Sequence, residues 1–363
     1  MASRFEQIRR RVAARSGFLT AALELTYRCN FECVHCYCVV GGPRQELSTR
    51  EYISLLDDLK AAGCLTVTLT GGEAMLRPDF FEIAEHAARE RFIVRLFSNG
   101  LLLDGERLER AMALNLMSID ISLYGVSEST YRAVTGHEGF ERVASNIDAL
   151  RTRGQRMLIK LPIMRENFHE LDEMVAFCTS RDLPYNIDVW MTPKDDGSMK
   201  PLGHQISDEQ LRDYFARYAR GVEPKPRTLG RELCTLGRGT AIIGPYGDVF
   251  GCVQSKISVG NVRERNVAEI WRDAEFLEKE RSLKFSDFVE CNSCEFRESC
   301  FICPSVSFYE NGRFNGPSKY ACKSAQMRYE IGQFESRPVL HQIVVPGKTQ
   351  LRAEPAASEE NAA

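Results

Sequence analysis

The sequence predicts an α/β protein in which a series of strand–helix units precedes a smaller cysteine-rich domain. From about residue 21 to residue 220, apolar strand-like runs alternate with amphipathic helical patterns, which is typical of successive βα units. A proline-broken connection follows over residues 221–227, and such a stretch favours a domain boundary. Seven of the 13 cysteines lie after this connection. We therefore predict one domain over residues 21–220 and a second over residues 221–335.

The composition narrows the class of protein. The chain has 363 residues, of which 44% are hydrophobic, enough for two domains with a sizeable core. Its net charge of −3 provides no general attraction to nucleic acid or to an anionic membrane. No long apolar run and no secretory signal are present. We therefore expect a cytoplasmic protein without nucleic-acid or membrane partners, whose reduced thiols bind metal or clusters.

The individual elements follow in chain order. Residues 1–20 predict a helical arm, to which we assign no function. A helix over residues 48–59 should begin at the N-cap Ser48, with Glu51 as its capping-box partner. Residues 336–363 form a tail with too little apolar content to order itself. Strands are expected over residues 22–27, 65–70, 93–98, 117–123, 157–163 and 186–191.

Three cysteines follow the first strand-like run directly. Cys29, Cys33 and Cys36 are separated by three and then two residues. Thiols at this spacing can hold one face of a cubane cluster and leave its fourth iron without a protein ligand. A catalytic site keeps such a position free for a small molecule, whereas a structural site closes its shell. The triad therefore predicts a catalytic iron–sulfur cluster, and a zinc site is the alternative.

The triad, with His35 before its last cysteine, resembles the cluster motif of the radical S-adenosylmethionine (SAM) superfamily. The strand-like run over residues 64–70 ends in Gly71, Gly72 and Glu73, which resemble that superfamily's GGE motif. In isolation these three residues are only a turn signal, so their order and distance from the cysteines matter. The resemblance implies a partial (β/α)6 barrel in which this motif approaches the methionine part of SAM and helps bind its amino group.

Two further strand ends resemble SAM-binding stretches of the superfamily. The resemblance implies that Ser98, Asn99 and Ser122 meet the ribose and amino-acid parts of SAM. Taken alone, they are ordinary strand-to-turn residues. Asp188 and Trp190 on the sixth expected strand either point into the cavity or fill the barrel wall, and we favour the wall. No residue is assigned to proton exchange with the substrate.

The later cysteines resemble the SPASM domain, a C-terminal domain that holds two auxiliary [4Fe–4S] clusters. The resemblance implies an outer cluster on Cys291, Cys294, Cys300 and Cys322. It implies an inner cluster on Cys234, Cys252 and Cys303, whose fourth ligand is not identified. The family usually has three residues between its fifth and sixth cysteines, but here only Phe301 and Ile302 separate them. The position of Cys303 is therefore open, and a tetrahedral zinc site over residues 291–303 is the alternative.

Three cysteines remain outside these sets. Cys64 and Cys178 are interpreted as buried apolar thiols. Cys38, two residues after the triad, is interpreted as a bystander.

The resemblance implies reductive cleavage of SAM. An electron from a flavodoxin- or ferredoxin-type donor enters the catalytic cluster, and SAM yields methionine and a 5′-deoxyadenosyl radical that takes a hydrogen atom from the substrate. The auxiliary clusters would accept or relay the remaining electron, or bind the substrate. An electron carrier would need neither an open iron nor a GGE strand end, so we favour an enzyme.

The favoured substrate is a precursor peptide, because relatives with a SPASM domain mostly modify peptides or protein side chains. The arm over residues 1–20 is too short for leader recognition, so a separate leader-binding protein is expected. The alternative within the enzyme interpretation is a dehydrogenase or oxidase of a small biosynthetic intermediate.

Overall fold

The computed structural model of the chain describes residue 12 and residues 17–39, 44–218, 234, 236–331 and 343–346. Most of the arm predicted over residues 1–20 and the whole connection 221–227 lie outside these described residues, as does most of the tail. None of the helices in the described part of the chain is long and apolar enough to span a membrane.

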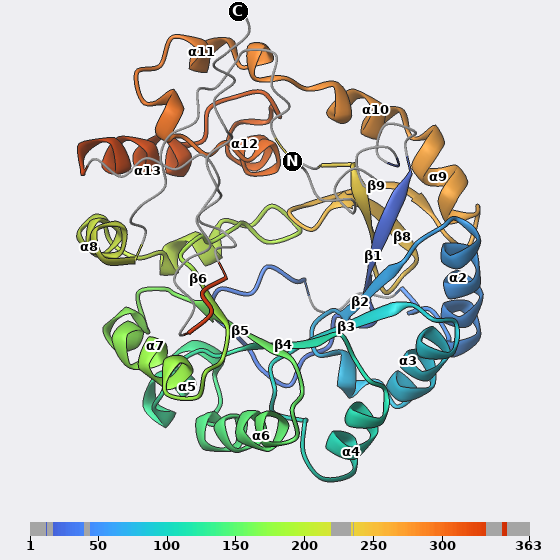
Figure 1. Cartoon of the computed structure of the whole chain (residues 1–363). Helices are drawn as coiled ribbons and strands as arrows, with labels where there is room; N and C mark the ends of the chain where they lie inside the picture. The colour runs from blue at the N-terminus through green and yellow to red at the C-terminus, as the bar shows by residue number, and fades with distance from the viewer. Residues whose placement is uncertain are drawn as a thin grey trace, which may run out of the picture.

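One curved sheet of nine strands organises the described chain (Figure 1). Its first six strands run parallel in the spatial order β6-β5-β4-β3-β2-β1. They are β1 (Phe18–Glu24), β2 (Thr66–Thr70), β3 (Ile93–Ser98), β4 (Ser118–Ser122), β5 (Met157–Pro162) and β6 (Tyr185–Asp188). The predicted α/β fold with six parallel strands is confirmed.

Helices connect these strands and follow the outer side of the curved sheet in Figure 1. They are α2 (Thr49–Ala61), α3 (Phe80–Arg89), α4 (Gly105–Ala113), α5 (Glu128–Thr135), α6 (Phe140–Thr152) and α7 (Leu171–Thr179). The capping-box prediction is confirmed, because Ser48 Oγ accepts from the N–H of Glu51 and the Glu51 carboxylate accepts from the N–H of Ser48. The same part of the chain contains the short 3-10 helices η1 (Ala74–Leu76), η2 (Phe168–Glu170) and η3 (Lys200–His204).

The first strand lies earlier in the chain than expected. β1 begins at Phe18, inside the segment assigned to the arm, and ends at Glu24 instead of residue 27. Phe18 is buried, and its ring lies 5.5 Å from that of Trp271, centroid to centroid. This contact with the C-terminal part of the chain stabilises the early start of β1. No local sequence pattern predicts that start.

The two faces of the barrel strands differ in character. Leu96, Ile121 and Ile159 are fully buried and alternate with polar residues that must lie on the opposite, inner face. On that face Arg95 Nη2 lies 2.6 Å from Asp120 Oδ2, and Lys160 Nζ lies 3.7 Å from the same oxygen. The inner face of the barrel therefore carries an ion-pair network beneath the carboxyl ends of the strands.

The cysteine-rich part of the chain continues the barrel sheet. β7 (Gly239–Ile243) pairs parallel with β1, and β8 (Asp248–Cys252) and β9 (Ser255–Asn261) follow it in antiparallel order. A buried ion pair reinforces this junction, because Lys256 Nζ on β9 lies 2.6 Å from both carboxylate oxygens of Glu24 on β1. The two predicted parts of the chain therefore share one sheet.

The remaining C-terminal elements are helical. They are α8 (Asp208–Tyr218), which precedes β7, and then α9 (Val267–Asp273), α10 (Glu275–Ser282), η4 (Phe285–Asp287), α11 (Val289–Asn292), η5 (Arg297–Ser299), α12 (Pro304–Asn311) and α13 (Lys319–Glu330). Figure 1 shows α11 to α13 on the side of the molecule opposite the barrel helices. A small apolar cluster that includes Phe285, Phe288 and Ile302 packs beneath them.

Candidate active site

The cysteine triad lies in the loop that follows β1. Backbone hydrogen bonds fasten this loop to the end of α5, from Glu32 N to Thr135 O (2.8 Å) and from Val34 N to Val134 O (2.9 Å). These bonds hold all three thiols on one short segment at the carboxyl end of the barrel strands. The structure therefore places Cys29, Cys33 and Cys36 where the chemistry of such a barrel is expected.

The surroundings of the three thiols differ. Burial raises the pKa of Cys29 and of Cys33. A hydrogen bond from Cys38 lowers the pKa of Cys36 to about 7. Iron binds thiolates, so ligation would have to offset the burial of the first two. Cys38 is buried, and its contact with Cys36 makes it a neighbour of the triad rather than a distant thiol.

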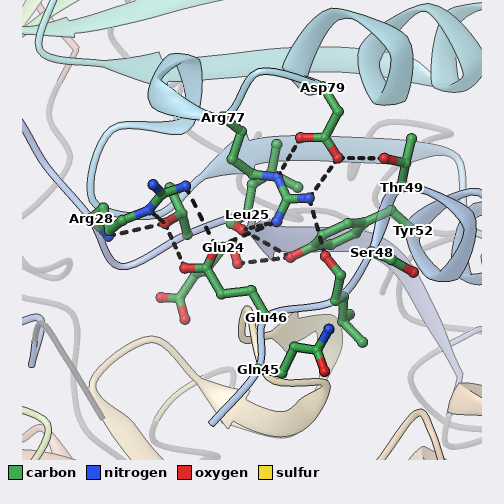
Figure 2. Close-up of polar contacts among 12 residues, drawn as sticks. Glu24, Leu25, Arg28, Gln45, Glu46, Ser48, Thr49, Tyr52, Arg77 and Asp79 are labelled. Carbon is green, nitrogen blue, oxygen red and sulfur yellow. Dashed lines mark hydrogen bonds and ion pairs between the residues drawn. The ribbon is translucent and has the colours of Figure 1, made fainter. Parts of the chain in front are cut away.

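The buried side chain of Arg77 binds backbone carbonyls next to the start of this loop (Figure 2). The Arg77 guanidinium donates to the carbonyls of Leu25 (3.0 Å) and Leu47 (3.1 Å), and Asp79 binds it from the other side at 2.6 Å. The hydroxyl of Tyr52 on α2 also donates to Leu25 O at 3.2 Å. The sequence analysis assigned no role to Arg77. The signal in the sequence that could have indicated one is its position four residues after Glu73.

The two glycines of this turn contact the cysteine loop directly. A Cβ atom on Gly71 would lie 2.3 Å from Thr26 O, and one on Gly72 would lie 2.3 Å from Arg28 O. Gly71 also has a φ of 136°, which favours glycine. The N–H groups of Gly72 and Glu73 donate to Thr26 O and Arg28 O. These close approaches are to the backbone of the loop that carries the cysteines, and the expected approach of the two glycines to SAM stays a prediction.

Glu73, Ser98 and Asn99 form one buried unit. The Glu73 carboxylate accepts from the Ser98 hydroxyl (3.0 Å) and from the backbone N–H of Asn99 (2.9 Å). Burial nevertheless raises the pKa of Glu73. The Asn99 side chain donates to Asn30 Oδ1 at 2.8 Å and lies 3.9 Å from Cys29 Sγ. The structure thus brings three predicted SAM contacts together and connects them to the cysteine loop.

Ser122 reaches the same loop through an aromatic neighbour. Burial raises the pKa of Tyr124, and the neighbouring Ser122 side chain opposes this rise. Burial likewise raises the pKa of Cys33, and the Tyr124 side chain opposes that rise. The Tyr124 ring also lies 5.5 Å from the His35 ring, centroid to centroid. Tyr124 had no predicted role, although it follows the strand end that contains Ser122. The structure makes it the link between β4 and the triad.

The inner face below these strand ends carries titratable groups. Lys160 pairs in register with Ser122 across β4 and β5, and its Nζ lies 3.0 Å from the centroid of the Phe97 ring. Burial lowers the pKa of Lys160 to about 8 and raises that of Asp188 to about 6. Both shifts favour the neutral forms, so this face holds groups that can exchange protons near neutral pH.

Asp188 and Trp190 border a cavity at the last strand of the barrel. This cavity lies between β6, α8 and the C-terminal part of the chain, and Phe301 and Tyr320 line it with them. The Trp190 ring packs edge-on against Tyr320 (4.4 Å) and Phe301 (5.6 Å), centroid to centroid. Both residues border this cavity at the edge of the barrel, and the wall interpretation stays a prediction.

The seven later thiols separate into two neighbourhoods. Burial raises the pKa of Cys303 to about 12, and the charges of Cys252 and Cys234 add to the shift. These three thiols are therefore neighbours, despite the two-residue spacing before Cys303. The second neighbourhood contains Cys291, Cys294 and Cys322, which influence one another, and Cys300, whose Sγ lies 4.0 Å from the carbonyl of Ala321.

The spacing of the thiols argues against a preformed zinc site. Zn–S bonds of about 2.3 Å place tetrahedral thiolates roughly 3.8 Å apart. Among the described residues, which include all 13 cysteines, no three thiols lie within 4.8 Å of one another. Within the described part of the chain, the one group that meets this limit consists of Asp57 on α2, His86 on α3 and Glu90 directly after α3. Glu90 is already paired with Lys60.

Two family models match the chain. The radical SAM superfamily matches residues 23–178, and an iron–sulfur cluster-binding domain, SPASM, matches residues 234–295. Among curated proteins, the chain is 27% identical to the AdoMet-dependent heme synthase of Methanosarcina barkeri, over 81% of this chain and 93% of that protein. It is also 27% identical to the mycofactocin maturase MftC of Mycolicibacterium smegmatis, over 81% of this chain and 80% of that protein.

A solved structure shares the fold. SuiB of Streptococcus suis, bound to its precursor peptide SuiA, superimposes with a TM-score of 0.67 at 15% sequence identity. The match covers 89% of this chain and 82% of that one. At this identity the likeness concerns the architecture alone.

Proposed function

Because the chain belongs to the radical SAM superfamily and carries a SPASM iron–sulfur domain, we propose that it modifies a precursor peptide by abstracting hydrogen from a side chain. The product carries an oxidative modification or a crosslink, and the enzyme is a radical SAM oxidoreductase of the peptide-maturase type. Its similarity to a mycofactocin maturase carries the proposal, and the fold that it shares with a precursor-peptide enzyme supports it.

In this proposal Cys29, Cys33 and Cys36 hold the [4Fe–4S] cluster that binds SAM. When SAM is bound and the cluster is reduced, the two together would supply the 5′-deoxyadenosyl radical. Unpaired donors in the loop fit such a group, because Asn30 Nδ2 and His35 Nδ1 are buried without a hydrogen-bond partner in the described chain. Donors next to the cysteines suit cluster sulfides or the carboxylate of SAM as acceptors.

The residues around the triad then position SAM. Glu73, Ser98, Asn99 and Ser122 contact it, and the first three act as one unit because they share hydrogen bonds. Gly71 and Gly72 approach the methionine part of SAM, and they also set the distance between the end of β2 and the cysteine loop. The neighbouring Lys160 and Asp188 on the inner face offer polar groups that orient a substrate side chain and can exchange protons with it.

Partners complete the proposed reaction. A flavodoxin- or ferredoxin-type protein reduces the catalytic cluster, and a separate leader-binding protein presents the precursor peptide. The thiols in the neighbourhood of Cys234 would hold an inner auxiliary [4Fe–4S] cluster and those in the neighbourhood of Cys291 an outer one. Such clusters would supply sites for the electron that remains after hydrogen abstraction.

The test is anaerobic incubation of the reconstituted protein with SAM, reductant, candidate precursor peptides and leader-binding partner. We expect 5′-deoxyadenosine together with a peptide lighter by about two hydrogen atoms, measured by mass spectrometry. Peptides of unchanged mass, in reactions that do form 5′-deoxyadenosine, would contradict the peptide substrate and leave the SAM chemistry in place.

A small-molecule oxidase or dehydrogenase is the second candidate. The alignment with a heme synthase favours it, because that alignment covers 93% of the relative's length and its name denotes synthesis of a small molecule. Turnover of a co-encoded pathway intermediate, with every co-encoded peptide unchanged, would establish this candidate.

A further inference from the structure

The inner auxiliary site has three thiols but no fourth. Cys234, Cys252 and Cys303 are neighbours, and a [4Fe–4S] cluster has four irons to coordinate. Four other cysteines belong to the outer neighbourhood. Cys64 lies on the barrel, where its thiol meets the carbonyls of Leu19 and Thr66, and the other remaining cysteines, Cys38 and Cys178, also lie in the barrel part of the chain. The fourth position therefore needs another kind of ligand or stays open.

Glu280 on α10 is a buried carboxylate close to this site. Its side chain belongs to a residue that is only 7% exposed, and Oε2 has no hydrogen-bond partner within the described residues. Burial and Cys252 raise the pKa of Cys234 more strongly than the charge of Glu280 does, and Leu236 N–H and Arg238 lower it. The carboxylate therefore lies within electrostatic range of the first inner thiol.

The face of α10 that carries Leu277 and Glu280 packs toward the inner thiols. A Cβ atom on Gly251, the neighbour of Cys252, would lie 2.5 Å from Cδ2 of Leu277. The same side chain would lie 3.3 Å from a Cβ atom on Gly237, three residues after Cys234. Leu277 and Glu280 are three residues apart, so they share one face of the helix.

The adjacent cation Arg281 is bound to backbone carbonyls. Its Nε donates to Gly237 O (2.6 Å), and its Nη2 donates to Trp271 O (2.9 Å). Burial raises the pKa of Glu280 to about 7, and the charge of Lys279 opposes this shift. The ionised carboxylate is therefore costly at this place unless a cation binds it. Iron supplies the missing positive charge, and a carboxylate oxygen is an established type of iron ligand.

We propose that Glu280 is the fourth protein ligand of the inner auxiliary cluster, beside Cys234, Cys252 and Cys303. The proposal rests on the two auxiliary clusters of the proposed function. It has a functional consequence, because a cluster with four protein ligands has no open iron for the substrate. The inner cluster then transfers electrons and does not bind the substrate directly.

The experiment uses a protein in which Cys29, Cys33 and Cys36 are all changed to Ala, so that only auxiliary iron remains. This background should hold about eight irons. Glu280→Ala should lose about one iron and, after mild oxidation with ferricyanide, show the electron paramagnetic resonance signal of a three-iron cluster. Glu280→Cys should restore the eight irons without that signal. Glu278→Gln, an exposed position on the same helix, is the matched control and should change nothing.

The outcomes distinguish the assignment of Glu280 as a ligand from the presence of two auxiliary clusters. About eight irons and an unchanged spectrum in Glu280→Ala would overturn the ligand assignment and leave the two clusters in place. About four irons in the background protein itself would overturn the two-cluster assignment and this proposal together. Circular dichroism of Glu280→Ala must match that of the background, and rescue by Glu280→Cys distinguishes ligation from a packing role.

Discussion

The two sets of cysteines in this protein are assembled in opposite ways. The catalytic triad occupies eight consecutive residues, and backbone bonds to α5 together with Arg77 hold that segment in place. The inner auxiliary set comes from three segments, at Cys234, Cys252 and Cys303, which are 18 and 51 positions apart. The comparison shows that one chain can encode a site locally or leave its assembly to the tertiary fold, and the two sites should respond differently to mutation.

The largest expected effect comes from removing the triad. Changing Cys29, Cys33 and Cys36 together to Ala should abolish formation of 5′-deoxyadenosine, because no other thiol set leaves an open iron beside the SAM contacts. The auxiliary iron, about eight atoms, should remain. Chromatography of 5′-deoxyadenosine and iron analysis check both parts. Cleavage of SAM at the parental rate in the triple variant would refute the assignment.

The next effect concerns the junction between the two regions. Lys256→Met should leave Glu24 buried without its cation and cost about 3–5 kcal/mol in the free energy of unfolding. Anaerobic urea unfolding followed by circular dichroism measures this loss.

The double variant Glu24→Gln with Lys256→Met should recover much of that stability, since no buried charge remains. An equal loss in the single and double variants would mean that the ion pair does not join the two regions.

A smaller effect should follow Gly72→Ala. The new Cβ would meet Arg28 O at 2.3 Å, so the cysteine loop must move, at a cost of about 1–3 kcal/mol. We expect a lower iron content at the catalytic cluster with unchanged auxiliary iron. Gly203→Ala, where nothing lies within 4 Å of the new Cβ, is the control. Equal iron loss at the catalytic and the auxiliary sites would contradict a local effect on the cysteine loop.

The smallest effect is a pH dependence of the inner face. Burial lowers the pKa of Lys160 to about 8, so the unfolded chain binds more protons than the folded chain between pH of about 8 and about 10. The stability of the parent relative to Lys160→Met should therefore rise across this window, by on the order of 1 kcal/mol. Urea unfolding at several pH values measures it, with the exposed Lys279→Met as control. A difference independent of pH would contradict the shift.

Much of the barrel could be predicted because its signals are local. The alternation of apolar residues located six strands to within a few residues at most ends, and the Ser48–Glu51 capping box marked the start of α2. The early start of β1 was missed, since Phe18 joins the sheet through its contact with Trp271, about 250 residues later in the chain. Arg77 was missed because a buried arginine that binds backbone carbonyls has no distinctive sequence pattern.

The sequence by itself determined the cysteine triad, the Gly-Gly-Glu turn and the parallel six-stranded fold, because spacing and periodicity act over a few residues. Only the tertiary structure decided that β7 pairs with β1, that Cys303 lies with Cys234 and Cys252, and that Gly71 and Gly72 pack on the cysteine loop. Each of these contacts joins distant segments. Their partners depend on which backbone edges and buried charges meet once the core has formed, and no short stretch of sequence carries that information.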